Sequence, residues 1–309
     1  MAIDIAAGPD VDIVYGNEAA ATYGTVATTF TKVFGLDTKL SLNVDKNLGE
    51  YGDIGSRRLQ YFKSKKFDGS FDIDFIMSNA NFWDLVFNDG VGTALDPFTW
   101  EAYGNLLSFS TKINDRKEAK QWAVLGMAVN ELGLEFARGE PIKTKLSGLF
   151  ANFGAKTSSV ARSTLTLGGL DDAFTFAGGE LKIAAADNYV GLIAKGSLKI
   201  GNDLKGFGDI GVEVLQKIKG LKAIGGLTLG VKHASGATKY PIDMARAAST
   251  DGQNLAMSIV ITDGTRSITM ALTGCWMKSF STGYEAFEEI DENLVIVFSN
   301  ITVELAGFT

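Results

Sequence analysis

The chain has 309 residues, which is enough for two domains of the common size of about 120 to 150 residues. With 46% hydrophobic residues both can bury a core, and a net charge of −7 argues against a basic surface that binds nucleic acid. Cys275 is the only cysteine, which excludes an intrachain disulfide, and the sequence shows neither a signal peptide nor an apolar run of about 18 residues, so we expect cytoplasmic synthesis and no membrane partner.

The first part of the chain alternates between polar segments and candidate strands. Residues 1–30 are small and polar, and we expect an extended arm that is disordered or ordered by a neighbouring subunit. Residues 40–44 alternate, which predicts a strand with Ser41 and Asn43 on its wet face. The polar, glycine-rich stretch 45–66 predicts a long functional loop. Residues 71–75 alternate again and place Asp72 and Asp74 opposite the core.

Further elements follow in the same pattern. Residues 82–87 have apolar side chains at helical spacing, with Asn79 or Asn81 as a cap, and predict a short helix packed on a sheet. Alternating or apolar segments predict strands over 107–113, 121–129 and 142–153. Residues 157–188 are glycine-rich and predict a connector with room for a hairpin. The fold class that these elements indicate is mainly β.

An internal repeat organises the chain. Gly52-Asp53-Ile54-Gly55 recurs as Gly208-Asp209-Ile210-Gly211, an offset of 156, and 15 of the 35 positions from 35 to 69 are identical at this offset. Unrelated segments would share roughly two. A second block repeats with an offset of 148, so that 123–126 corresponds to 271–274 and 146–152 to 294–300. We therefore predict two homologous β domains, at 31–156 and 189–309, each with a short helix.

The smaller offset has two consequences for the second copy. It places about eight extra residues in the first copy, between 76 and 105. It also aligns the first strand of that block in the two copies. Leu255, Met257, Ile259 and Ile261 of the second copy then correspond to Leu107, Phe109, Thr111 and Ile113 of the first, in that order.

No motif for catalysis, a cofactor or a metal withstands comparison between the copies. Residues 206–211 match the dinucleotide fingerprint, but the first copy lacks the first glycine and no βαβ unit surrounds either segment. His233 is the only histidine, and Cys275 is expected to be a buried strand residue. The pair Asp72 and Asp74 is replaced by Thr228 and Gly230. We therefore expect neither an enzyme, a cofactor nor a metal site.

The layout resembles that of the major tail tube protein of long-tailed, non-contractile bacteriophages, in a duplicated form. The resemblance rests on the opening at 18–25, a strand, a long loop with Gly-Asp-Ile-Gly, the strand at 71–75, the short helix and the closing strand at 146–150. It implies β-sandwich or half-barrel domains whose strands join across subunits into a barrel. Single-domain members form hexameric rings, so two copies per chain imply a trimeric ring with pseudo-sixfold symmetry.

The resemblance also implies partners, a location and roles for individual residues. The partners would be further copies of the chain and other tail proteins (tape measure, tail terminator and distal tail protein), in a virion tail made in the host cytoplasm. Genomic DNA would pass through the channel without specific binding, past an acidic wall that does not hold a polyanion. Candidates for that wall are Ser41, Asn43, Asp72, Asp74, Lys199 and Thr228, and Lys199 departs from an acidic lining. Candidates for contacts between rings are Gly52, Asp53, Ile54, Gly55, Arg57, Arg58, Lys65, Lys66, Gly208, Asp209, Ile210 and Gly211.

Two alternatives remain from the residues alone. A sugar- or receptor-binding β-sandwich of a virion would need an exposed aromatic platform, for which Trp100 with Tyr103 is the candidate. A glycine-rich hydrolase is the enzymatic alternative, and the scarcity of histidine and cysteine opposes it.

Overall fold

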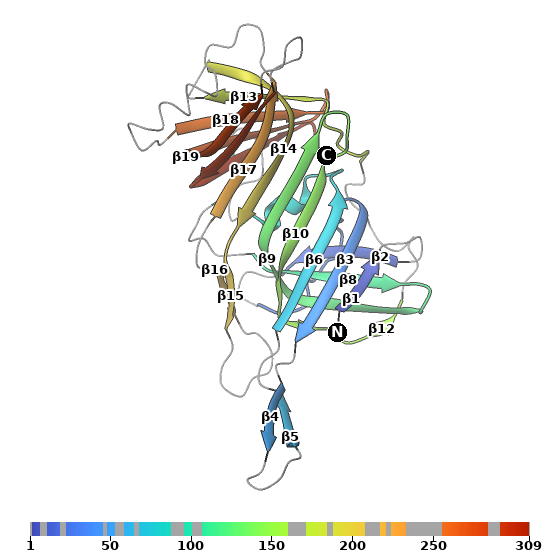
Figure 1. Cartoon of the computed structure of the whole chain (residues 1–309). Coiled ribbons are helices and arrows are strands. Elements are labelled where there is room, and N and C mark those ends of the chain that lie inside the picture. The colour runs from blue at the N-terminus through green and yellow to red at the C-terminus, as the bar shows by residue number, and fades with distance from the viewer. Residues whose placement is uncertain are drawn as a thin grey trace.

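The computed structural model describes residues 2–6, 11–18, 23–45, 48–52, 59–64, 68–87, 96–100, 107–159, 171–183, 188–207, 217–220, 224–232, 255–283 and 291–308. As the sequence predicts, the protein is mainly β, and a 17-stranded sheet dominates it (Figure 1). The strands of the first half are β1 (Ala2–Ala6), β2 (Val11–Asn17), β3 (Leu36–Asp45), β4 (Leu48–Gly52), β5 (Leu59–Ser64), β6 (Asp68–Ile76), β7 (Phe98–Thr99), β8 (Phe109–Asp115), β9 (Lys120–Ala137), β10 (Lys143–Phe150), β11 (Asn152–Phe153) and β12 (Thr157–Ser158).

The second half contains β13 (Gly178–Ile183), β14 (Asn188–Gly201), β15 (Leu204–Phe207), β16 (Lys217–Gly220), β17 (Ile224–Lys232), β18 (Leu255–Thr262), β19 (Ser267–Gly283), β20 (Asp291–Phe298) and β21 (Asn300–Ala306). A single 3-10 helix, η1 (Asn81–Leu85), lies among the described residues, where the sequence predicts a short helix at 82–87. Asn79 accepts a hydrogen bond from the N–H of Asn81 at 2.9 Å. The corresponding stretch of the second half lies outside the described residues.

The two halves are built with the same antiparallel registers. In the first half the order is β3, β6, β10, β9, and in the second half it is β14, β17, β20, β19. Leu42 lies opposite Phe71, and Leu198 lies opposite Leu227, 156 residues further along both strands. The registers of the next two pairs in each half also correspond, with the offset of 148 on the later strands.

The first strand of the second block is an exception to the alignment of the sequence. Phe109 lies opposite Met127, and Leu255 lies opposite Cys275, so Leu255 takes the place of Phe109. The assignment of Leu255 to the place of Leu107 was therefore wrong by two residues. The reason is a longer hairpin in the second half. There the strand pairing extends by one pair beyond Ile261 and Ile268 before the turn begins, and this pair accounts for the two additional residues.

The sheet has two layers because its two longest strands bend from one layer into the other. β9 and β19 are long strands that bend at Gly126 and Gly274, which have φ of 63° and 62° and are related by the offset of 148. Before the bend, β9 pairs with β8, and after it β9 pairs with β10 and β14. Phe71 of one layer packs on Phe109 of the other, with ring centroids 5.9 Å apart. The buried apolar residues of both halves form a single continuous cluster.

The N-terminal arm and the connector are more closely integrated than the sequence predicts. β2 lies within the expected arm 1–30, yet it pairs with β8 and buries Ile13, Val14 and Tyr15. The expectation of an arm overlooked the run 11–15, whose β-branched and aromatic residues are typical of a strand. β13 lies within the expected connector 157–188 and pairs with both β14 and β18.

Candidate assembly surfaces

One face of the sheet is packed on the second layer, and the opposite face is exposed. The strands β3, β6, β10, β9, β14 and β17 run side by side across it (Figure 1). Because side chains alternate along a strand, the buried residues Leu40, Leu42 and Ile73 fix their neighbours on the exposed side. The channel candidates from the sequence all fall on this one exposed face: Ser41, Asn43, Asp72, Asp74, Lys199 and Thr228.

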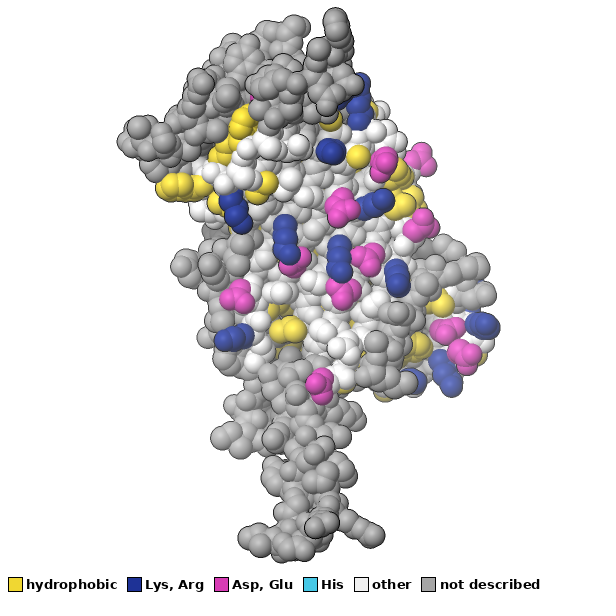
Figure 2. All heavy atoms as spheres, in the orientation of Figure 1, with side chains coloured by type: hydrophobic (Ala, Val, Ile, Leu, Met, Phe, Trp, Pro, Cys, Tyr) yellow, Lys and Arg dark blue, Asp and Glu magenta, His cyan; other side chains and the backbone are white. Residues whose placement is uncertain are grey.

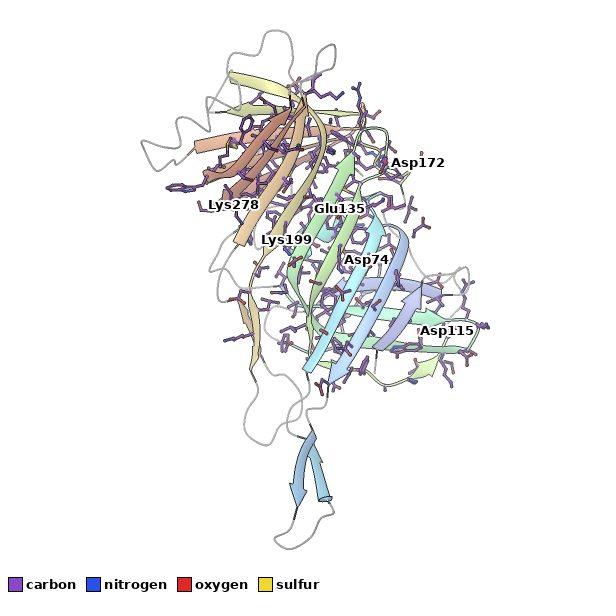
Figure 3. The ribbon with its side chains drawn as sticks, in the orientation of Figure 1. Asp74, Asp115, Glu135, Asp172, Lys199 and Lys278 are labelled. Atoms are coloured by element: carbon purple, nitrogen blue, oxygen red, sulfur yellow. The ribbon has the colours of Figure 1, made fainter. Side chains whose placement is uncertain are left out.

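The exposed face carries both signs of charge. Figure 2 shows lysines and acids interspersed over it, and Figure 3 shows Asp74, Glu135 and Lys199 on β6, β9 and β14. Lys145 Nζ lies 3.1 Å from an oxygen of Asp72, and Lys199 Nζ lies 2.8 Å from an oxygen of Glu131. Exposed pairs of this kind contribute about 0 to 1 kcal/mol each.

These cross-strand pairs change the expected character of the face. The hydrogen bond to Asp72 raises the pKa of Lys145, and the charges of Asp74 and Glu131 act in the same direction. The lysine therefore stays charged opposite its acids. The face is a mixed surface of positive and negative charges, and it does not have the wholly acidic character that the resemblance implies, since the exposed lysines of the same strands offset its acids: Lys39, Lys143, Lys145, Lys195 and Lys199.

The junction between the halves is made by β9 and β14. They pair antiparallel from Lys195 opposite Ala137 to Gly201 opposite Glu131. Asn202 is buried at the end of this junction. Its side-chain nitrogen donates a hydrogen bond to the carbonyl of Val129 at 3.1 Å, and its side-chain oxygen accepts one from Trp100 Nε1 at 3.0 Å. These contacts fix where β14 leaves the sheet toward β15.

The two ends of the sheet are not equivalent. β3 is covered on its outer edge by β1, with Ile5 opposite Leu40 and Ala2 opposite Asn43. At the other end, residues 276–283 of β19 pair with β20 alone among the described strands. Trp276 is 50% exposed there, whereas Ala128, its counterpart in β9, is 2% exposed. Trp276 lies opposite Val297, which is also exposed, so this edge carries an apolar patch.

The predicted loop at 45–66 is a β-hairpin instead of an open loop. β4 pairs with β5 so that Leu48 lies opposite Ser64, and the hairpin projects beyond the end of the sheet (Figure 1). β15 pairs with β16 so that Leu204 lies opposite Gly220, which is the same register 156 residues later. Gly52 is the last residue of β4. The other contact candidates lie outside the described residues: Asp53, Ile54, Gly55, Arg57, Arg58, Lys65, Lys66, Gly208, Asp209, Ile210 and Gly211.

The opening motif of the sequence has a specific structural role that sequence reasoning missed. The buried carboxylate of Glu18 accepts hydrogen bonds from Ser110 Oγ at 2.6 Å, from Gly126 N at 2.7 Å and from Gly24 N at 2.9 Å. Tyr23 donates its hydroxyl to the carbonyl of Gly126 at 2.9 Å. Burial, and then the nearby Glu18, raise the pKa of Tyr23. Glu18 thus anchors the N-terminal segment at the bend of β9.

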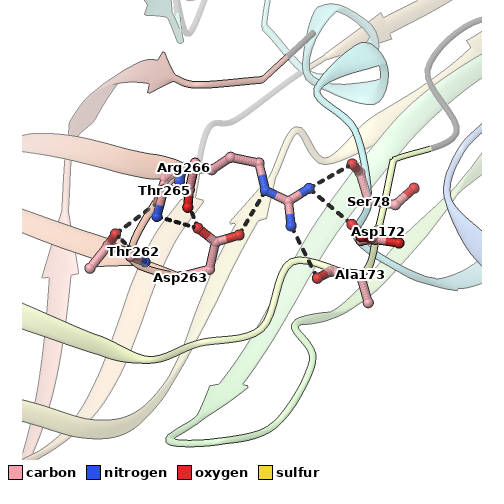
Figure 4. A network of polar contacts seen from close by, with 8 residues as sticks. Ser78, Asp172, Ala173, Thr262, Asp263, Thr265 and Arg266 are labelled. Carbon is pink, nitrogen blue, oxygen red and sulfur yellow. Dashed lines mark hydrogen bonds and ion pairs between the residues drawn. The ribbon is translucent and has the colours of Figure 1, made fainter.

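A second anchor joins the two halves at the opposite end of the sheet (Figure 4). Arg266, in the turn between β18 and β19, pairs with Asp263 at 2.7 Å. Its guanidinium also donates to backbone carbonyls of the first half and of the connector: Ser78, Asp172 and Ala173. It lies over the rings of Phe174 and Phe308. These contacts tie the second half to the end of β6.

The remaining candidates from the sequence do not form a chemical site. Trp100 is 2% exposed, so it is not the exposed platform that a sugar-binding surface requires. Gly206 lies in the hairpin strand β15, which pairs with β16 and therefore does not begin a βαβ unit. Cys275 is buried as predicted, and burial raises its pKa to about 12. His233 lies outside the described residues.

The described residues contain no group of three or more histidine, cysteine, aspartate or glutamate side chains that could hold a metal ion. No helix among them is long and apolar enough to cross a membrane.

The comparisons with known proteins identify the family of the chain. A family model described as phage tail tube protein matches residues 8–294. The chain belongs to the phage tail tube protein family. A comparison with curated proteins gave no match. The match covers nearly the whole chain, including both halves of the sheet, so the resemblance inferred from the sequence is confirmed.

Membership of the phage tail tube family gives the general function and location. The protein is a structural subunit of a tail tube, it resides in the tail of the virion, and it assembles with copies of itself and with other tail components. The family is structural and generally non-enzymatic, and no described site indicates catalysis. The exposed face, the two edges and the two hairpins are therefore candidate assembly surfaces.

Proposed function

We propose that three copies of this chain close into a ring of six homologous units, and that stacked rings form the tube through which the viral genome passes. The shared registers of the two halves support a duplicated domain, since both offsets of the sequence repeat recur in the strand pairing. The ring of six units is carried over from single-domain members of the family. Two units per chain then require three chains.

The junction between β9 and β14 supplies a template for the contact between subunits. In it, Ser197 lies opposite Glu135 and Lys199 lies opposite Gly133. Applying the offsets, 197 − 156 = 41 and 135 + 148 = 283 place Ser41 of one subunit opposite Gly283 of the next. The same arithmetic places Asn43 opposite Ser281. Closing the ring in this way pairs the exposed edge of β19 and removes the open ends of the sheet.

The packing of the sheet supports a choice of the face that would line the channel. In a closed barrel one face is inside and the other outside, and the second layer of strands occupies one of them. The exposed face with Asp72, Asp74 and Lys199 is then the channel wall. Some of its lysines are paired across strands, as in the contacts of Lys145 with Asp72 and of Lys199 with Glu131. Acids interspersed among the lysines weaken the attraction of the wall for phosphates, so it does not hold the passing polyanion.

The hairpins β4–β5 and β15–β16 are the proposed contacts between rings. Both leave the same end of the sheet, at equivalent positions of the two units (Figure 1). With three chains per ring they give six projections at equivalent places. The ends of the finished tube would meet the other tail proteins: tape measure, tail terminator and distal tail protein.

A designed disulfide tests the ring. The variant with Asn43→Cys and Ser281→Cys should form covalent trimers on oxidation, seen by denaturing electrophoresis, while electron microscopy shows tubes. Native mass spectrometry of short assemblies should give multiples of three chains. The observation that carries this expectation is the register of β9 and β14.

The control shifts the register by two residues. In the variant with Asn43→Cys and Ser279→Cys, the two Cα atoms lie farther apart than the roughly 7 Å that a disulfide can bridge. This variant should therefore give few covalent trimers. Tubes that form with six chains per ring would contradict the trimer. Tubes without any Asn43–Ser281 crosslink would place the contact elsewhere.

A further inference from the structure

The outer edge of β3 has an occupant in the single subunit. One edge of β3 pairs with β6 and the other pairs with β1, from Ala6 opposite Lys39 to Ala2 opposite Asn43. A strand has only one set of N–H and C=O groups on each edge, so a second strand cannot pair there while β1 remains.

The equivalent strand of the second half carries no such cover. β14 uses the corresponding segment, Lys195–Gly201, to pair with β9. β13, which precedes β14, pairs with β14 only from Asn188 to Leu192 and so leaves this segment open. The five residues of β3 covered by β1, Lys39–Asn43, correspond to Lys195–Lys199 at the offset of 156. β1 therefore lies on the segment at which the ring would receive β19.

We propose that β1 covers the assembly edge of β3 in the free subunit and is displaced by β19 of the incoming subunit. This inference rests on the proposed ring, and it adds a control on when the ring forms. An exposed strand edge pairs readily with other chains, and a short covering strand blocks such pairing until the correct partner arrives.

The two competing pairings can be compared position by position. β1 contributes five residues, and the junction of β9 with β14 spans seven positions of the strand, Lys195–Gly201, for five of which β19, described to Gly283, supplies the counterparts 279–283. β1 has the advantage of belonging to the same chain, which for a short tether corresponds to an effective concentration of about millimolar. The incoming β19 brings an apolar edge as well: its Trp276 is exposed, and its Phe280 is less buried than the counterpart Leu132, which is 0% exposed.

Displacement therefore exchanges a short intramolecular pairing for a pairing between subunits that also brings in the apolar edge of β19. The free subunit keeps β1 in place at low concentration. The ring replaces β1 and also pairs the residues of β19 that have only β20 as a partner among the described strands. Assembly then depends on concentration, because β19 of a second subunit must reach the edge of β3 in competition with β1.

A disulfide between β1 and β3 tests the proposal. Asp4 lies opposite Ser41, so Asp4→Cys with Ser41→Cys should lock β1 in place. The oxidised variant should remain a single subunit and should form tubes after reduction, followed by light scattering and electron microscopy. Cys275 stays out of this exchange because it is buried and its pKa is raised to about 12.

A matched disulfide provides the control. Thr228→Cys with Val295→Cys joins β17 to β20, two strands that stay paired in both states, so the oxidised variant should assemble as the wild type does. A second variant removes residues 2–6, and its initial rate of assembly should rise several-fold over that of the wild type. This variant also shows whether rings can form if the wild type assembles slowly on its own.

The outcomes separate the two proposals. If the wild type and the oxidised Asp4–Ser41 variant both form rings, β1 does not control the edge and this inference is wrong, while the ring stands. If the disulfide fails to form in the free subunit, β1 does not lie on β3 and the inference is also wrong. If neither the wild type nor the variant without residues 2–6 forms rings, the proposed ring fails with it.

Discussion

At the scale of single residues, the bend glycines hold the two layers of the sheet together. Gly126 has φ of 63°, and a Cβ there would lie 2.7 Å from Ala151 Cβ and 3.0 Å from Tyr23 Cζ. We expect Gly126→Ala to lower the free energy of unfolding by about 2 kcal/mol or more, because left-handed backbone costs about 1 to 2 kcal/mol outside glycine and the contact adds to it. Chemical denaturation followed by circular dichroism measures this loss.

Gly139 is the matched control for the bend. Its φ is 81°, but a Cβ would meet no atom within 4 Å. Gly139→Ala should therefore lower the free energy of unfolding only by the cost of the left-handed backbone, about 1 to 2 kcal/mol. Equal losses in the two variants would show that the contact with Ala151 and Tyr23 adds nothing.

At the scale of elements, the turn between β18 and β19 links the halves through charged groups. Burial alone would raise the pKa of Asp263, but hydrogen bonds from the N–H groups of Arg266 and Thr265 and the pairing with Arg266 lower it overall. A carboxylate with a lowered pKa stabilises the fold above its unfolded pKa, and this stabilisation disappears as the pH falls through the folded pKa.

Asp263→Asn should therefore be less stable than the wild type at pH 7, by on the order of 1 kcal/mol for the lost charged hydrogen bond. The difference should begin to shrink below about pH 4, where the carboxyl group of the unfolded chain takes up a proton, and it should disappear only as the pH falls through the lower pKa of the folded carboxylate. Urea unfolding measured from pH 7 down to pH 3 tests the sign. A difference that stays constant over this range would show that the charge of Asp263 does not contribute.

At the scale of the whole molecule, the projecting hairpins should separate ring formation from tube formation. The sequence alone suggests deleting residues 49–58, but this would remove most of β4 and leave β5 without its partner. We therefore expect the cleaner result from replacing residues 48–64 by a short glycine-serine linker. That variant should keep its β-sheet circular dichroism and its trimeric rings and lose long tubes. Normal tubes in electron micrographs would place the contact between rings elsewhere.

The sequence by itself determined the features that follow from local pattern. Alternation predicted the strands that contain Leu42 and Ile73, since a half-buried strand must alternate, and it thereby placed Asp72 and Asp74 on the exposed face. The repeat predicted the corresponding registers of the two halves, because equal spacing of apolar residues gives equal pairing. The layout of the motifs identified the tail tube family.

Only the tertiary structure decided the features that depend on pairing between distant segments. β1 and β2 join β3 and β8, and although the runs 2–5 and 11–15 are strand-like in composition, they do not indicate which edge each strand would join. Glu18 acquires its role from the bend at Gly126, 108 residues away, and the buried Trp100 donates a hydrogen bond to Asn202 of the other half. A sequence pattern records which face of a strand is apolar, whereas the neighbour that covers an edge is chosen by the whole fold.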